Sequence, residues 1–409
     1  MTSNSLALIA AKVASLGFGF VFWVAAARLF PQAEVGVAAG VVAAMMLCTQ
    51  LMLMGVGSAV IVQLPRNRSR PGPLLDTSFA IVAIASLIGA AAFLVLAAGA
   101  FSELDVVSSS VLYSVEFLIA SVFGTVWILL DQVSTAQRRG DHALIRALML
   151  GVFMFALLGG LAAASGSEGS EVIFAPWAIG TLAVCAIGFV QLRRSLGYRL
   201  RARVLKSHAR TLVRLGVANH MLTLAERAPG LVLPIVVIEL VSPEANAAWY
   251  AAWAMATVVY WVPMQFGMTL FAELADEPES MGELVQRGLR HSLAIAATCA
   301  AVVAIGAGPL LSLLGEGYAE AGVEPLRLLL LAFLPMAFVQ AYFAVCRATG
   351  RLREGIGAGW ALALAATAIA IAAAAGGSLD QVALAWVVAQ FAAGIWAAWR
   401  LWNLLRGDG

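Results

Sequence analysis

Charged residues are scarce in this chain, and long polar stretches are scarcer still. Only 12% of the 409 residues are charged, whereas 62% are hydrophobic, and the mean hydropathy is +0.92. Soluble domains carry about twice that share of charge. The longest polar interval, residues 193–214, is too short to fold as a domain. The composition excludes an ordinary soluble protein and places its activity within a bilayer or at its faces.

Cysteine and histidine are also few, with four of each. The cysteines all lie in apolar stretches without a pairing pattern, which predicts packing roles rather than disulfides. The histidines lack metal-ligand spacing, and no nucleophile elbow or phosphate-binding loop is present. We therefore expect no enzyme, no cofactor, no metal and no room for a nucleotide-binding domain. The basic residues are distributed as in membrane proteins generally and do not argue for nucleic-acid binding.

Long apolar stretches dominate what remains, and a helical membrane span needs about 20 such residues. The sequence predicts an all-α integral membrane protein with about twelve transmembrane helices. The expected spans are 6–29, 36–63, 76–99, 108–131, 143–165, 172–192, 215–240, 247–273, 291–314, 324–346, 355–375 and 382–404.

Positive charge falls on every second connection between these spans. Of the 25 Lys and Arg residues, 22 lie at Lys12 and within 66–70, 138–146, 193–214, 287–290, 347–353 and 400–406. The other connections are acidic, with Glu34, Glu103, Asp105, Glu168, Glu171, Glu239, Glu244, Glu316, Glu320, Glu324 and Asp380. Because basic connections mark the cytoplasmic side, an even number of spans places both termini in the cytoplasm. Arg28, Arg227 and Arg327 are the exceptions.

The basic interval divides the chain into two sets of six spans. Tight exits at 30–34 and 241–245 and long acidic connections at 100–107 and 315–324 recur in the same order. We therefore expect an N-terminal six-helix lobe over 1–192, a basic cytoplasmic linker over 193–214 and a C-terminal six-helix lobe over 215–409. An even number of spans per lobe makes this a parallel pseudo-repeat, and transporters built from repeats place the substrate path between them. An accidental division of twelve spans by two is the alternative.

Two adjacent ionisable residues, Glu226 and Arg227, fall in the middle of the seventh span. Ionised side chains at this depth cost roughly 2.5–3.5 kcal/mol on insertion scales. Neighbouring residues point about 100° apart on a helix, so the two cannot simply neutralise each other. Either the pair serves a substrate or proton site, or one member forms a packing ion pair with another helix.

The same span carries His220 and Asn219 on its polar face, and other spans contribute isolated charges. Lys12 is either an anchor at the cytoplasmic surface or a cavity cation, and Arg28 is either interfacial or substrate-binding. Glu116 reads as a hydrogen-bonded carboxyl or, alternatively, a coupling-ion site, for which Glu226 is the other candidate. Aromatic residues such as Trp249 and Tyr260 fit an interfacial belt or a sugar platform.

Five short segments carry a resemblance to a known family: ARLFPQAEVG at 27–36, GVGSA at 55–59, AWYAAW at 248–253, LFAE at 270–273 and GEGYAEA at 315–321. They resemble segments of the polysaccharide and oligosaccharide flippases of the multidrug/oligosaccharidyl-lipid/polysaccharide (MOP) exporter superfamily. The acidic–basic pair Glu226–Arg227 falls where many members carry one.

The resemblance implies two six-helix lobes around a central cavity that alternates its access. It implies export of a lipid-linked oligosaccharide of the polyprenyl-diphosphate type across a bacterial cytoplasmic membrane, for surface polysaccharide or lipopolysaccharide synthesis. Other membrane proteins of glycan assembly would be partners, and Arg227, then Lys12, would meet the diphosphate. The chain lacks the two extra spans and the cavity arginines of lipid II flippases. A cation-coupled multidrug antiporter of the same superfamily is the alternative, followed by a membrane glycan polymerase or ligase.

Overall fold

The computed structural model describes residues 3–67, 69–165, 169–201, 203–276 and 280–406, and every regular element in these ranges is a helix. Arg68 and Glu168, which contribute to the predicted charge pattern, lie outside the described residues. Within these described ranges, eleven helices are long and apolar enough to cross a membrane. The number becomes twelve if α13 (Glu316–Leu330) and α14 (Phe333–Ala348), bent by 44°, form one span. The prediction of an all-α, multi-pass membrane protein is confirmed.

The chain forms two compact units, Met1–Leu224 and Ala225–Gly409, and the division falls inside α9 (Lys206–Leu240). Much of the segment predicted as a linker is helical, because α8 continues to Leu196 and α9 begins at Lys206. The predicted domain limits at 192 and 215 stay predictions.

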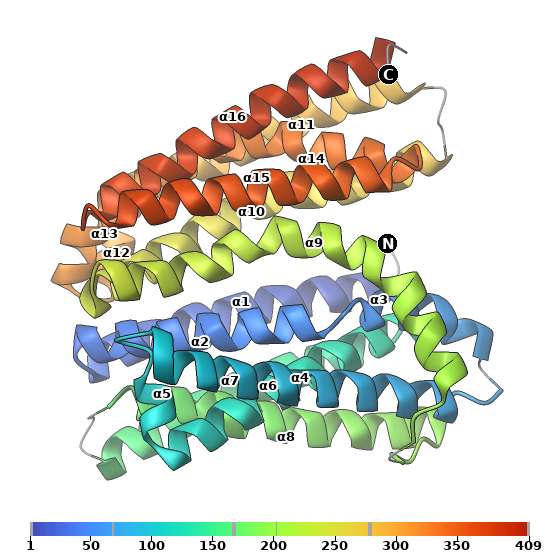
Figure 1. Cartoon of the computed structure of the whole chain (residues 1–409), viewed down its shortest axis with the longest axis horizontal. Helices are drawn as coiled ribbons and strands as arrows, with labels where there is room; N and C mark the ends of the chain where they lie inside the picture. Colours follow the sequence, from blue (N-terminus) through green and yellow to red (C-terminus); the bar gives the residue numbers. More distant parts are fainter. Residues whose placement is uncertain (1–2, 68, 166–168, 202, 277–279, 407–409) are drawn as a thin grey trace. The chain divides into compact units, whose positions relative to one another are not determined.

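Unit 1 is built around α6, which packs against α2, α3, α4, α7 and α8. In Figure 1 the long helices of this unit run alongside one another. Its core is formed by aliphatic side chains such as Leu75, Val82, Leu129 and Val133, all completely buried. The helices of the unit before α9 are α1 (Ser3–Leu29), α2 (Gln32–Met52), α3 (Val56–Gln63), the short 3-10 helix η1 (Pro65–Asn67), α4 (Gly72–Ala100), α5 (Val106–Ser109), α6 (Val111–Ala136), α7 (Gly140–Ser165) and α8 (Ser170–Leu196).

The second predicted span is interrupted, because the chain turns between α2 and α3. Met54 (φ 48°) and Gly55 (φ 73°) both adopt left-handed backbone conformations there, which interrupt the regular pattern of helical hydrogen bonds. The turn sits against α9, where a Cβ added to Gly216 would overlap the carbonyl oxygen of Gly55. Only glycine permits this approach of two backbones.

Unit 2 is arranged around α10 and α14, which pack extensively against each other. Besides the second part of α9, its helices are α10 (Pro243–Asp276), α11 (Met281–Ile305), α12 (Ala307–Ser312), α13, α14, α15 (Leu352–Ala374) and α16 (Leu379–Arg406). Trp249 is completely buried and stacks on Trp253, which also contacts Tyr260 and Trp386. Trp249 and Tyr260 are therefore core residues of this unit rather than an interfacial belt or a sugar platform.

The two units share four helix pairings. Unit 1 pairs α2 with α6, α4 with α6, α6 with α8, and α7 with α8. Unit 2 pairs the corresponding helices in the same order, α10 with α14, α11 with α14, α14 with α16, and α15 with α16. This agreement favours an internal repeat over an accidental division of the spans. The interruptions differ, since unit 1 breaks its second span and unit 2 breaks its fourth.

Candidate functional site

Glu226 and Arg227 lie on the part of α9 that belongs to unit 2, shortly before Pro229. The Glu226 carboxylate accepts hydrogen bonds from Nη2 of Arg347 on α14, at 3.3 and 3.4 Å. Only 9% of the Glu226 side chain and 7% of the Arg347 side chain are exposed, so this is a buried ion pair. The sequence assigned Arg347 to a basic cytoplasmic connection; the structure places it in the last turn of α14, facing inward.

Arg227 points elsewhere and is exposed. Among the residues that the structure describes, its guanidinium makes no ion pair and no hydrogen bond. The three charged groups here are therefore one buried pair, Glu226 with Arg347, and one additional cation. Their formal sum is one positive charge, from two arginines and one glutamate.

A small cavity of about 60 Å³ adjoins the carboxylate of Glu226. Its polar lining comes from Gln340 on α14 and Gln390 on α16, and Trp386 closes part of it. The Nε of Arg347 is buried and has no hydrogen-bond partner in the described part of the chain. A water-sized guest could reach the pair here, but a sugar could not.

His220 and Asn219, predicted on the polar face of the same span, behave differently from each other. Nε2 of His220 lies 2.9 Å from the carbonyl oxygen of Gln50, at the interrupted end of α2. His220 is buried, and it satisfies a carbonyl that the break removes from the regular helical pattern. Asn219 is exposed, and its carbonyl oxygen accepts a hydrogen bond from the hydroxyl of Thr223. His220 therefore fastens α9 to α2 within unit 1.

Lys12 and Arg28, the remaining candidate cations, are exposed at two different levels of α1. Lys12 lies close enough to Asp131 on α6 for their charges to interact. Lys12 and Arg28 belong to unit 1, whereas the Glu226–Arg347 pair belongs to unit 2. Each of the two cations takes part in contacts of its own.

A polar network that the sequence did not predict occupies unit 1. Arg146, only 1% exposed, donates to the Asp131 carboxylate at 2.6 Å and to the hydroxyl of Ser134 at 2.8 Å. It also donates to the side-chain oxygen of Gln191, so α6, α7 and α8 are joined at one level. Arg146 was counted among the cytoplasmic connections and is instead a buried residue of α7.

Glu116, the other proposed coupling residue, is half-buried on α6, and one carboxylate oxygen, Oε2, has no hydrogen-bond partner among the described residues. Glu171, in the first turn of α8, is close enough for mutual repulsion. The Tyr113 hydroxyl, in the same region, contacts that of Ser170 at 3.4 Å. No group of three or more His, Cys, Asp or Glu residues that could hold a metal occurs in the described ranges.

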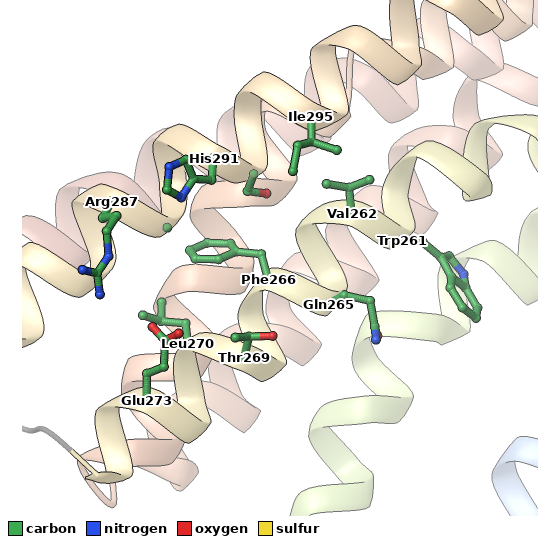
Figure 2. A pocket seen from close by; sticks show the side chains of 12 residues that line it. Trp261, Val262, Gln265, Phe266, Thr269, Leu270, Glu273, Arg287, His291 and Ile295 are labelled. Atoms are coloured by element: carbon green, nitrogen blue, oxygen red, sulfur yellow. The ribbon is translucent and has the colours of Figure 1, made fainter. Parts of the chain in front are cut away.

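A pocket of about 530 Å³ lies between α10 and α11 in unit 2. Figure 2 shows Gln265, Thr269 and Glu273 on α10 and Arg287 and His291 on α11. Apolar side chains complete the wall, among them Val262, Phe266, Leu270 and Ile295. A pocket with apolar walls and a few polar groups suits an amphipathic molecule.

The partners Arg347, Asp131 and Arg146 were missed because each was judged by its place in the sequence. All three lie near the ends of predicted spans, where an arginine normally reaches the membrane surface. One signal was available, since Asp131 and Arg146 end and begin consecutive spans and therefore lie at a similar depth. No comparable local signal pairs Glu226 with Arg347, because the two are 121 positions apart.

Comparison with known proteins relates this architecture to transporters. The chain matches no protein-family profile and no curated protein by sequence. Among solved structures, the lipid II flippase MurJ in an inward closed conformation matches with a TM-score of 0.72 at 12% identity, covering 97% of this chain and 87% of MurJ. An inward-facing multidrug resistance MATE family transporter of the MOP superfamily matches with a TM-score of 0.70 at 14% identity, covering 99% and 98%.

A third match is a MOP superfamily transporter from Pyrococcus furiosus, whose binding pocket is reported to have reverse polarity. Its TM-score is 0.61 at 13% identity, covering 99% of this chain and 96% of that one. The chain has the fold of MOP-superfamily transporters. At such low identities, the structural similarity shows the MOP fold alone. The similarity does not distinguish drug transport from lipid flipping.

Proposed function

We propose that this chain is a flippase that moves a lipid-linked oligosaccharide across a bacterial cytoplasmic membrane, with both termini in the cytoplasm. The substrate would carry a polyprenyl diphosphate, and the product would feed surface polysaccharide synthesis. Partners would be the bilayer, the glycolipid and other membrane proteins of glycan assembly.

The observation that carries this proposal is the sign of the charge at Glu226, Arg227 and Arg347. Glu226 is already neutralised by Arg347 at 3.3 Å, which leaves the exposed Arg227 as an excess cation within a span. An arginine at bilayer depth without a carboxylate partner is expected to face a water-filled path rather than lipid. A diphosphate suits such a cation, because guanidinium groups bind phosphate oxygens in a bidentate geometry.

Arg347 would then keep the charge of Arg227 available for the substrate. By occupying the Glu226 carboxylate, it prevents Glu226 from neutralising its neighbour. Glu226 would act as a positioning group, and coupling to a proton through this carboxylate stays a further possibility for experiment.

The test compares Arg227→Gln with Arg327→Gln in the full chain reconstituted in vesicles. Arg327 is the matched control, because it is an exposed arginine whose nearest carboxylate, Glu324, is 3.9 Å away. A fluorescent polyprenyl diphosphate bearing a short oligosaccharide would be the probe, and its flipping would be followed with an impermeant quencher. We expect Arg227→Gln to slow flipping about tenfold or more, the value of one charge-assisted hydrogen bond. Unchanged flipping in Arg227→Gln, or equal loss in both variants, would contradict the proposal.

A cation-coupled drug antiporter is the second candidate, favoured by the unpartnered carboxylate oxygen of Glu116. This function predicts gradient-driven efflux of a cationic dye by the wild-type chain and its loss in Glu116→Gln. Dye efflux together with an absence of glycolipid flipping would replace the first proposal by this one.

A further inference from the structure

A cleft of about 300 Å³ lies where the chain between α8 and α9 meets the beginning of α4 in unit 1. One wall is formed by Pro71, Gly72 and Pro73, at the start of α4, and the other by residues 196–199 with Arg201 and Arg203. The arginine distribution predicts that this face is cytoplasmic. No step of the proposed transport cycle uses the cleft.

Hydrogen bonds attach the described residues of the segment that forms the cleft to the beginning of α4. The Tyr198 hydroxyl donates to the Asp76 carboxylate at 2.7 Å, and the main-chain amide of Arg201 donates to the same oxygen at 3.0 Å. The amide of Leu205 donates to the hydroxyl of Thr77 at 3.1 Å. The segment is therefore held to α4 by three donors of its own, the side chain of Tyr198 and two main-chain amides. The arginine side chains are not needed to build the cleft.

Three exposed arginines, Arg199, Arg201 and Arg203, line this cleft. None of them forms an ion pair within the described residues. Asp76 also lines the cleft, but its carboxylate already accepts two hydrogen bonds. The net charge is therefore strongly positive, and the amino end of a long helix at the same place adds to it.

Two apolar side chains distinguish this segment from a purely basic loop. Leu200 is 56% exposed and Val204 is 49% exposed, and neither lines the cleft. Exposed leucine and valine beside unpaired arginines are expected at the boundary between headgroups and acyl chains, where both find suitable surroundings. A freely diffusing phosphate would explain the arginines but would leave these two side chains without a partner.

We propose that this cleft binds the phosphate of an anionic phospholipid headgroup, while Leu200 and Val204 enter the adjoining lipid. The chemistry shared with inorganic phosphate is a phosphate oxygen held by guanidinium groups. The apolar side chains add the preference for a lipid. Each arginine near an anionic membrane surface strengthens binding by about fivefold.

The experiment measures phosphatidylglycerol retained by the full chain in detergent, by native mass spectrometry, with phosphatidylcholine as the zwitterionic comparison. The triple variant R199Q/R201Q/R203Q should lose bound phosphatidylglycerol by about tenfold or more. The matched control is R193Q/R194Q/R210Q, which removes the same charge from exposed arginines of the same connection that do not line the cleft. The control should retain the lipid, and thermal unfolding should be similar for both variants because the main-chain attachments persist.

A second arm distinguishes lipid from free phosphate. L200Q/V204Q should weaken phosphatidylglycerol retention while leaving all three arginines in place, and excess inorganic phosphate should displace little lipid from the wild-type chain. Equal loss in both arginine triples would overturn the proposal in favour of diffuse surface charge. Complete displacement by inorganic phosphate, or no effect of L200Q/V204Q, would overturn it in favour of a soluble ligand.

Discussion

Nη2 of Arg347 lies 3.3 Å from Oε1 of Glu226, and this contact joins α14 to α9 inside unit 2. Because Arg347 compensates its charge, the Glu226 carboxylate is tolerated in the interior of the unit and is held in one position. Its behaviour on mutation should therefore differ from that of a surface ion pair.

A double-mutant cycle on Glu226 and Arg347 should reveal strong coupling. Arg347→Leu alone leaves a buried carboxylate unpaired and should destabilise unit 2 by about 3–5 kcal/mol, whereas E226L/R347L should recover most of the loss. The free energies of unfolding of both variants are measured in detergent by tryptophan fluorescence. Glu324→Gln, which breaks the exposed contact with Arg327, is the control and should change stability by less than about 1 kcal/mol. Additive effects of the two leucine variants would show that the ion pair is not formed.

Gly216→Ala should lower the stability of the fold by more than the addition of one methyl group usually does. The new methyl group would overlap the Gly55 carbonyl, and neither the methyl group nor this main-chain carbonyl can rotate away. We expect a loss of about 1–3 kcal/mol, typical of overpacking, measured as the unfolding temperature in detergent. Gly160→Ala on α7, where nothing lies within 4 Å of the added carbon, is the matched control and should be neutral or slightly stabilising. Equal effects at the two glycines would contradict the close helix contact.

The orientation of the chain can be tested with single cysteines on opposite faces. Asp105→Cys lies on a predicted outer connection and Arg193→Cys at the predicted cytoplasmic end of α8, and both positions are exposed. In a background with Cys299 replaced by serine, an impermeant maleimide should label only Asp105→Cys in intact cells. Both should react after permeabilisation. The reverse labelling would invert the topology that the arginines predict.

The attachment of Tyr198 to Asp76 should be insensitive to pH near neutrality. Burial, and then the hydrogen bond to Asp76, raise the pKa of Tyr198 above its usual value of about 10. Because the protonated phenol is the donor, the stability it contributes is present below the unfolded pKa and is lost only as pH rises through the folded value. Amide exchange at Arg201 and Leu205 should therefore be flat over about pH 6–9 once corrected for intrinsic rates.

Tyr198→Phe removes the donor and should accelerate exchange at both amides, with a loss of about 1.5–3 kcal/mol for a bond to a charged group. The amides of residues 193 and 194, in the last turn of α8, provide the internal reference. Unaltered exchange at Arg201 would mean that Asp76 holds the segment without Tyr198.

The helical fold could be predicted from the sequence because few backbone structures other than a helix are stable in lipid. Apolar stretches of span length predict helices irrespective of their detailed packing. The interruption at Met54–Gly55 was not predicted, since a left-handed methionine has no local signature. The close approach of the Gly55 and Gly216 backbones at this turn is a tertiary contact, which the local sequence does not reveal. The break in the tenth predicted span was likewise not visible in the composition.

Only part of the candidate site could be predicted from the sequence. Glu226 and Arg227 stand out because charge is rare in the middle of a span. The partner that distinguishes them, Arg347, sits where an arginine normally marks a span end, so its inward direction depends on packing in unit 2. The contact of His220 with Gln50 could not be predicted, because it requires knowledge of the break in α2.

That contact also defines the chemical form of the imidazole. The carbonyl oxygen of Gln50 can only accept, so the hydrogen of His220 must reside on Nε2. In the neutral ring the lone pair is then confined to Nδ1, which makes the Nε2–H tautomer the one that nitrogen NMR should observe. A break in one helix thereby dictates the protonation pattern of a side chain on another.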